Sequence, residues 1–196
     1  MMEIIGKILV NVLDAIYKPF GYAILTSVLL MFLYLYIKDV GVKQVLRKWI
    51  NSFQVSAQFR KLFVLSFYTI ILLFRTLFNR NIWANPISNV IGIWGIYDEK
   101  GVLTTETIEN FILFMPFIFL LFWCFRKEII GQSVKFIAVI KQSLVITFLF
   151  SLTTELLQLV FRIGTFQLSD LFYNTLGGFI GGLIYWIAYK ITHRKK

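Results

Sequence analysis

Polar side chains that could do chemistry are concentrated near the C-terminal end of the chain. Glu155, Gln158 and Arg162 are spaced three and four residues apart, so they share one face of a helix. Asp170 and Asn174 share a face of the next helix in the same way. Ionisable groups inside a membrane span are costly, so they usually face a partner or a wet cavity. We therefore expect a polar site between these two helices.

The elements that must position these residues are membrane helices. The chain has 196 residues, 58% of them hydrophobic, and its mean hydropathy is +0.76. Several apolar runs reach the roughly 20 residues that a bilayer core requires. These features exclude a soluble domain. They predict an all-α fold, a polytopic membrane helix bundle with about five transmembrane helices and additional amphipathic interfacial helices.

The sequence divides into three parts. Residues 1–18 predict an amphipathic interfacial helix, 19–61 the first transmembrane helix with a basic cytoplasmic loop, and 62–196 the main membrane domain. The five predicted spans cover residues 19–37, 62–78, 110–125, 136–161 and 170–191. The first and third are short, which leaves re-entry into the membrane as an alternative to crossing. Pro116 predicts a kink in the third.

The net charge of +10 has a marked distribution along the chain. Fourteen Lys and Arg residues fall on one side of the predicted membrane and six on the other. The positive-inside rule then predicts a multi-pass protein of the plasma membrane, with its N-terminus outside and its C-terminus in the cytoplasm. Because cytoplasmic loops account for the basic excess, we do not expect a nucleic-acid partner.

This orientation brings the polar residues of several spans to the outer leaflet. The predicted ligand-binding residues are Arg75, Asn110, Glu155, Gln158, Arg162, Asp170 and Asn174. A site at this depth would meet lipid headgroups, lipid-linked precursors or extracellular amphiphiles. Glu155 and Asp170 are the candidates for a catalytic role. We predict neither a metal nor another cofactor.

Other interpretations of the same residues remain open. Interhelical polar contacts stabilise ordinary membrane proteins by about 0.6–2 kcal/mol each, so the group could serve helix packing alone. Arg75 and Arg162 could balance Glu155 and Asp170, or they could hold a phosphate. A hard cation would need Glu155 and Asp170 to converge, with Glu109 as an optional third, since two or three carboxylates could hold it.

Two glycine pairs, Gly177-Gly178 and Gly181-Gly182, form a small-xxx-small pattern. This pattern permits close approach of helix backbones. The predicted neighbour is the span 136–161, whose Thr147 and Ser151 continue the polar face inward. The glycines indicate packing and carry no information about chemistry.

At these residues the sequence resembles the VanZ-like family of membrane proteins, which is named for an accessory determinant of teicoplanin (glycopeptide) resistance. The shared motifs are Glu155-x-x-Gln158, Ile163-Gly164-Thr165, Asp170, Asn174-Thr175, Gly177-Gly178, the segment 110–117 and Asn85-Pro86. They lie within residues 62–190, which makes 62–196 a VanZ-like membrane domain. Many relatives have glycine where this chain has Ile118. The resemblance implies a cell-envelope role in bacteria, commonly Gram-positive ones, but supplies no biochemical activity.

Two functional hypotheses of different classes follow. In the first, the protein is not an enzyme, and its outer pocket contacts membrane lipids and binds a lipid-linked cell-wall precursor or a lipoglycopeptide. In the second, it is a membrane enzyme that modifies a lipid headgroup or a polyprenyl-phosphate-type substrate, with Glu155 and Asp170 as acid or base. A lipid transporter is a third alternative, but the inner halves of the spans have no polar residues comparable to those of the outer site.

Overall fold

The computed structural model describes residues 2–36, 42–78, 82, 84–98 and 101–193. Within these residues the chain forms seven α-helices and one π-helical segment, and it contains no strand beyond an isolated bridge between Tyr97 and Leu103. The elements are α1 (Met2–Tyr17), α2 (Phe20–Tyr36), α3 (Val42–Val55), α4 (Ala57–Leu73), η1 (Phe74–Phe78), α5 (Glu106–Ile129), α6 (Phe136–Phe161) and α7 (Leu168–His193). The predicted all-α bundle is confirmed.

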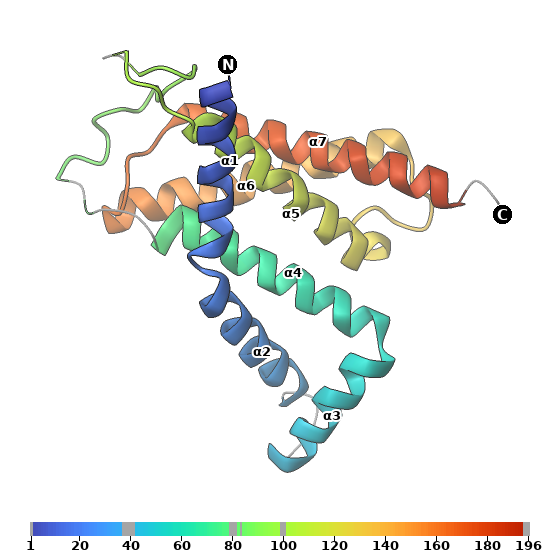
Figure 1. Cartoon of the computed structure of the whole chain (residues 1–196). Helices are drawn as coiled ribbons and strands as arrows, with labels where there is room; N and C mark the ends of the chain where they lie inside the picture. The colour runs from blue at the N-terminus through green and yellow to red at the C-terminus, as the bar shows by residue number, and fades with distance from the viewer. Residues whose placement is uncertain (1, 37–41, 79–81, 83, 99–100, 194–196) are drawn as a thin grey trace.

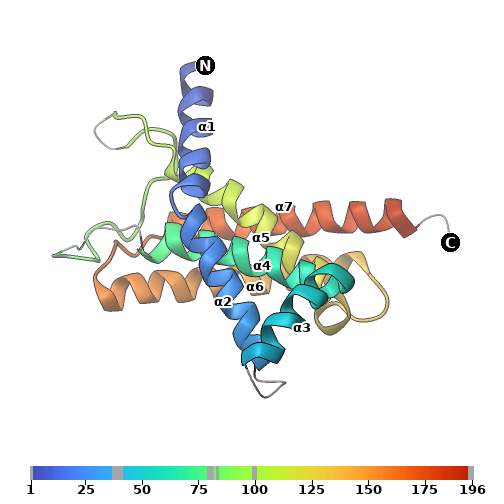
Figure 2. The same cartoon turned by 60° about the horizontal axis from the view of Figure 1, so that its bottom comes forward.

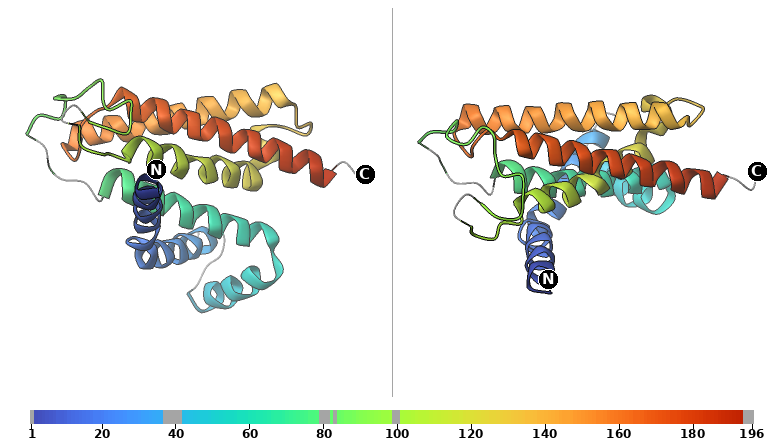
Figure 3. Two further views of the ribbon diagram at one scale, coloured as in Figure 1. Left: turned by 45° about the horizontal axis from the view of Figure 1, so that its top comes forward. Right: turned by 90° about the horizontal axis from the view of Figure 1, so that it is seen from above.

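Four long helices make up the bundle. The spans Ala57–Phe78, Glu106–Ile129, Phe136–Phe161 and Leu168–His193 are each long and apolar enough to cross a membrane. They lie side by side, as the views in Figure 1 and Figure 3 agree. The loop end of the bundle carries the segment 84–98 and the α6–α7 turn, whereas the C-terminal end carries the α5–α6 connection and His193.

The N-terminal helices do not continue this parallel arrangement. The axes of helices α1 and α2 are bent by 40° relative to each other. The two helices add a fifth candidate span only if the bent pair is counted as a single span. Figure 2 shows α1 running across the direction of the bundle helices near the loop end. Leu9 and Leu13 of α1 are exposed, whereas Asn11 and Asp14 are partly buried against the bundle. The face of α1 that carries Asn11 and Asp14 therefore lies toward the protein.

The basic loop predicted after the first span contains helix α3, which packs on its neighbours. Trp49 of α3 stacks on Phe32 of α2 and meets Phe59 of α4 edge to face. At the α3–α4 junction the Ser56 hydroxyl accepts a hydrogen bond from Phe59 N at 3.2 Å, which starts α4. The end of the first predicted span, residue 37, lies outside the described residues.

The third span differs from its prediction in length and bending. Helix α5 covers Glu106–Ile129, so the third span is long enough to cross and needs no re-entrant path. The predicted span starts at Asn110, whereas the helix already includes the three residues before Glu109 and Glu109 itself, which is buried. The backbone angles of α5 depart from helical values at Phe125, and not at Pro116 as predicted.

Glycines let α7 pack closely against two helices. A side chain on Gly177 would place its Cβ 2.2 Å from the Phe111 carbonyl oxygen of α5, and Gly181 is equally tight against Met115. Gly178 faces Thr147 of α6. The predicted neighbour, α6, is thus only one of two, and α7 lies between α5 and α6.

Candidate binding site

Glu155 holds the turn between α6 and α7. It is only 2% exposed, and its Oε2 accepts a hydrogen bond from the backbone N–H of Gln167 at 2.8 Å. Gln167 in turn donates to Thr165 Oγ1 at 2.8 Å. A buried backbone N–H needs a partner, so this carboxylate stabilises the path of the turn.

Gln158 connects the same helix to the end of the second span. Its Nε2 donates to the Thr76 carbonyl oxygen at 2.6 Å. Thr76 lies in η1, close to a helix end, where the last carbonyls lack helical partners. Gly164 packs on the Gln158 side chain, where an added Cβ would come within 3.0 Å of Oε1. Gln158 therefore fixes η1 to the α6–α7 turn.

The polar face of α7 meets α6. Asn174 Nδ2 donates to Ser151 Oγ at 2.9 Å, and both side chains are buried. Asp170, one turn earlier, is 2% exposed. Glu155, Gln158, Asp170 and Asn174 are all buried on these two helices, and together we call them the polar group between α6 and α7.

Arg162 lies apart from this group. It ends α6 in a left-handed backbone conformation, with φ 55° and ψ 33°, and its side chain is exposed. The spacing rule that placed it with Glu155 and Gln158 holds only while the chain stays helical. Because α6 ends at Phe161, the Arg162 side chain leaves the shared face, and the structure does not bring it to the predicted pocket.

Arg75 and Glu109 form a second polar group. Arg75 Nη2 lies 2.6 Å from Glu109 Oε2, and the two side chains are 23% and 4% exposed. The other oxygen of Glu109 accepts from Asn11 Nδ2 at 2.9 Å and from the Thr105 hydroxyl at 2.5 Å. Asn110 is buried beside Glu109 on α5. This group joins α1, η1 and α5.

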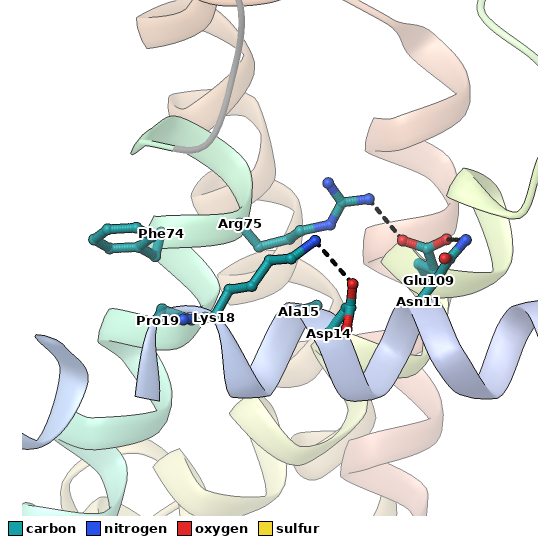
Figure 4. A pocket seen from close by; sticks show the side chains of 8 residues that line it. All are labelled: Asn11, Asp14, Ala15, Lys18, Pro19, Phe74, Arg75 and Glu109. Atoms are coloured by element: carbon teal, nitrogen blue, oxygen red, sulfur yellow. Dashed lines mark hydrogen bonds and ion pairs between the residues drawn. The ribbon is translucent and has the colours of Figure 1, made fainter. Parts of the chain in front are cut away.

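A cavity of about 240 Å³ opens beside the ion pair. Figure 4 shows the Arg75 and Lys18 side chains extending in the same direction, Arg75 toward Glu109 and Lys18 toward Asp14, with Lys18 Nζ 2.8 Å from Asp14 Oδ2. The lining residues are Asn11, Asp14, Ala15, Lys18, Pro19, Phe74, Arg75 and Glu109. We call this the Arg75 cavity. Of the predicted ligand-binding residues, only Arg75 lines it.

The segment between η1 and α5 covers the α6–α7 turn. The backbone N–H groups of Phe166 and Leu168 donate to the carbonyl oxygens of Pro86 and Val90 at 2.9 and 2.8 Å. The Tyr173 hydroxyl donates to the Trp94 carbonyl oxygen at 2.7 Å. The Asn85-Pro86 motif therefore contributes its backbone to the site, which explains why it accompanies the α6–α7 motifs.

Sequence reasoning missed the contribution of α1. Asn11, Asp14 and Lys18 form part of the polar stripe of the predicted interfacial helix, and in the structure they line the Arg75 cavity. The available signal was the 3.6-residue spacing of this stripe together with Pro19, which ends α1. That spacing identifies a polar face but does not say whether water or protein covers it.

The carboxylates do not gather for a cation. Glu109 belongs to the Arg75 cavity, whereas Glu155 and Asp170 lie in the group between α6 and α7. Over the described part of the chain, no three His, Cys, Asp or Glu side chains lie close enough to hold a metal ion. The three-carboxylate interpretation is therefore wrong for these residues.

Taken together, four to five apolar helices with buried polar groups define a multi-pass membrane protein. A family model described as VanZ/LLP1 matches residues 20–189. The chain belongs to the VanZ/LLP1 family, as its motifs predict. The match begins at α2 and so extends ahead of the quoted motifs.

A curated relative is similar to about half of the chain. Protein VanZ of Enterococcus faecium is 32% identical over 116 residues, which cover 55% of this chain and 66% of that protein. The similarity thus spans slightly less than two thirds of the relative's length. No solved structure matches the chain.

Proposed function

We propose that the protein is a non-enzymatic component of the bacterial envelope, linked to glycopeptide resistance. Its Arg75 cavity would bind the phosphate-bearing end of a lipid-linked cell-wall precursor, or an anionic lipoglycopeptide such as teicoplanin. The observation that carries the proposal is that Arg75 and Lys18 both line one cavity. Membership of the VanZ/LLP1 family, whose VanZ name refers to teicoplanin resistance, supports the same biological setting.

Hydrogen-bond donors, and not net charge, favour an anion here. Two carboxylates accompany the two cations, so the four charged side chains sum to zero. A guanidinium has five N–H donors and an ammonium has three. Among the described residues, Arg75 uses one donor on Glu109 and Lys18 pairs only with Asp14. The remaining donors could hold phosphate oxygens in a defined geometry.

The surroundings of the cavity suit an amphiphile. Phe74 and Pro19 form apolar parts of its lining, and Phe74 stacks on Tyr22 of α2. Helices α1 and α2 also have exposed apolar side chains, such as Leu13 and Leu25. A polyprenyl or acyl chain could therefore remain in the bilayer while its phosphate reaches Arg75.

The proposal includes an orientation. The loop end, next to the Arg75 cavity, would face the outside, and the C-terminal end would face the cytoplasm of a plasma-membrane protein. The charge distribution supports this direction, because the basic α5–α6 connection and the C-terminal turn of α7 lie at the same end.

Binding can be tested with purified protein in nanodiscs and polyprenyl diphosphate as the probe. We expect Lys18→Gln and Arg75→Gln each to weaken binding about tenfold or more, since charged hydrogen bonds contribute roughly 1.5–3 kcal/mol. Lys18→Gln is the cleaner variant, because Lys18 is exposed and pairs only within α1.

The matched control is Arg162→Gln, which removes the same charge from an exposed site outside the cavity. The same variants would be expressed in cells whose teicoplanin susceptibility depends on the protein. The assignment would be refuted if Lys18→Gln and Arg162→Gln lost polyprenyl diphosphate binding equally. It would also be refuted if binding were unchanged in both Lys18→Gln and Arg75→Gln.

A further inference from the structure

A second cavity lies at the opposite, C-terminal end of the bundle. It measures about 370 Å³ and is bounded by α4, α5 and α7. Its cationic side chains are Lys61 from the first turns of α4 and Arg126 from the end of α5. Trp123, Tyr185 and Tyr189 supply aromatic walls. No carboxylate is among the lining residues.

Aromatic rings and carbonyl oxygens hold the two cations. Lys61 Nζ lies 4.9 Å from the centre of the Trp123 ring and donates to the Trp123 carbonyl oxygen at 3.5 Å. The Arg126 guanidinium lies 5.3 Å from the Tyr189 ring and donates to its hydroxyl at 3.2 Å. In the described part of the chain, neither cation pairs with a carboxylate.

Such an arrangement calls for an anion from outside the chain. Lys61 and Arg126 are both partly buried, and a partly buried charge normally has a counter-ion. Cation–π contacts contribute only about 0.5–2 kcal/mol and leave the outward donors unused. A phosphate group between the two side chains would satisfy those donors and balance the charge.

We propose that this C-terminal cavity binds the phosphate headgroup of an anionic membrane lipid. Basic pockets between membrane helices on the cytoplasmic side suit such headgroups. Phe119, also in the lining, gives an acyl chain an apolar wall deeper in the bilayer. This site lies at the other end of the molecule from the Arg75 cavity, so it does not depend on the function proposed there.

The test measures lipid retention by the purified full-length chain. Phosphatidylglycerol or phosphatidylcholine is titrated into detergent-solubilised protein, and native mass spectrometry counts the bound lipids. We expect one phosphatidylglycerol to bind in preference to phosphatidylcholine. Lys61→Gln/Arg126→Gln should lower this affinity about tenfold or more, given roughly 1 kcal/mol for each basic residue.

The matched control is Lys127→Gln/Lys135→Gln, which removes two exposed charges at the same end but outside the cavity. Lys61→Gln alone provides a milder variant, because it leaves the Arg126 contact with the α5–α6 connection intact. A parallel thermal titration with inorganic phosphate distinguishes a lipid from a free anion. The proposal would be overturned if both double variants lost phosphatidylglycerol affinity equally, or if the protein showed no preference for phosphatidylglycerol. Binding of inorganic phosphate in place of the lipid would also overturn it.

Discussion

Gln158 shows what a single polar residue contributes between membrane helices. Its amide donates to the Thr76 carbonyl oxygen near the end of η1, and carbonyl groups at helix ends generally need partners from outside the helix. In a bilayer no water replaces such a partner, so the bond serves both the turn and the packing of two spans.

We predict that Gln158→Leu lowers the unfolding free energy by about 1–2 kcal/mol, because the buried Thr76 carbonyl loses its donor. Thermal or SDS-induced unfolding in detergent measures the change. Gln142→Leu is the control, since Gln142 lies on the same helix and makes no side-chain hydrogen bond within the described chain. A comparable loss in both variants would contradict the role given to Gln158.

The Arg75–Glu109 pair makes a second prediction at the residue scale. Glu109 is nearly buried, so Arg75→Gln leaves a charge without its partner, and we expect a cost of about 3 kcal/mol. Arg75→Gln/Glu109→Gln should recover part of this loss. The four proteins form a double-mutant cycle measured by unfolding, and additive effects would show that the two side chains do not interact.

Helix α7 carries the tightest packing at the scale of elements. Gly177 and Gly181 face carbonyl oxygens of α5, and Gly178 faces a side chain of α6. We predict that Gly177→Ala costs about 1–3 kcal/mol, because the new methyl group must push two backbones apart. Gly21→Ala on α2, where nothing lies within 4 Å, should be neutral. The stabilities of the two variants in detergent check this, and equal behaviour would argue against the close α5–α7 contact.

At the scale of the whole molecule, the two cavities lie at opposite ends of one bundle. The predicted orientation can be tested after replacing Cys124 with alanine, which leaves a chain without cysteine. In intact cells, a membrane-impermeant maleimide should label Ser88→Cys at the loop end but not Ser133→Cys at the C-terminal end. Both positions are exposed. The reverse pattern would invert the proposed topology.

Much of the architecture follows from the sequence alone. Apolar runs bounded by charged residues predict the helices of the bundle, because a bilayer tolerates few alternatives to a closed helix. The polar spacing within each helix likewise places Glu155 with Gln158 and Asp170 with Asn174. These are local properties, fixed by the 3.6-residue repeat.

The tertiary structure decided which helices meet and which polar faces they cover. Local periodicity cannot show that Asn11 of α1 bonds to Thr105 and Glu109. These partners lie 94 and 98 positions away in the sequence, and they meet Asn11 only when the chain is folded. It also cannot show that α6 ends one residue before Arg162 and thereby directs that side chain outward. The sequence predicts one pocket, whereas the structure has two separate polar groups. One lies between α6 and α7, and the packing of α1 against α5 places Glu109 and Arg75 at the Arg75 cavity.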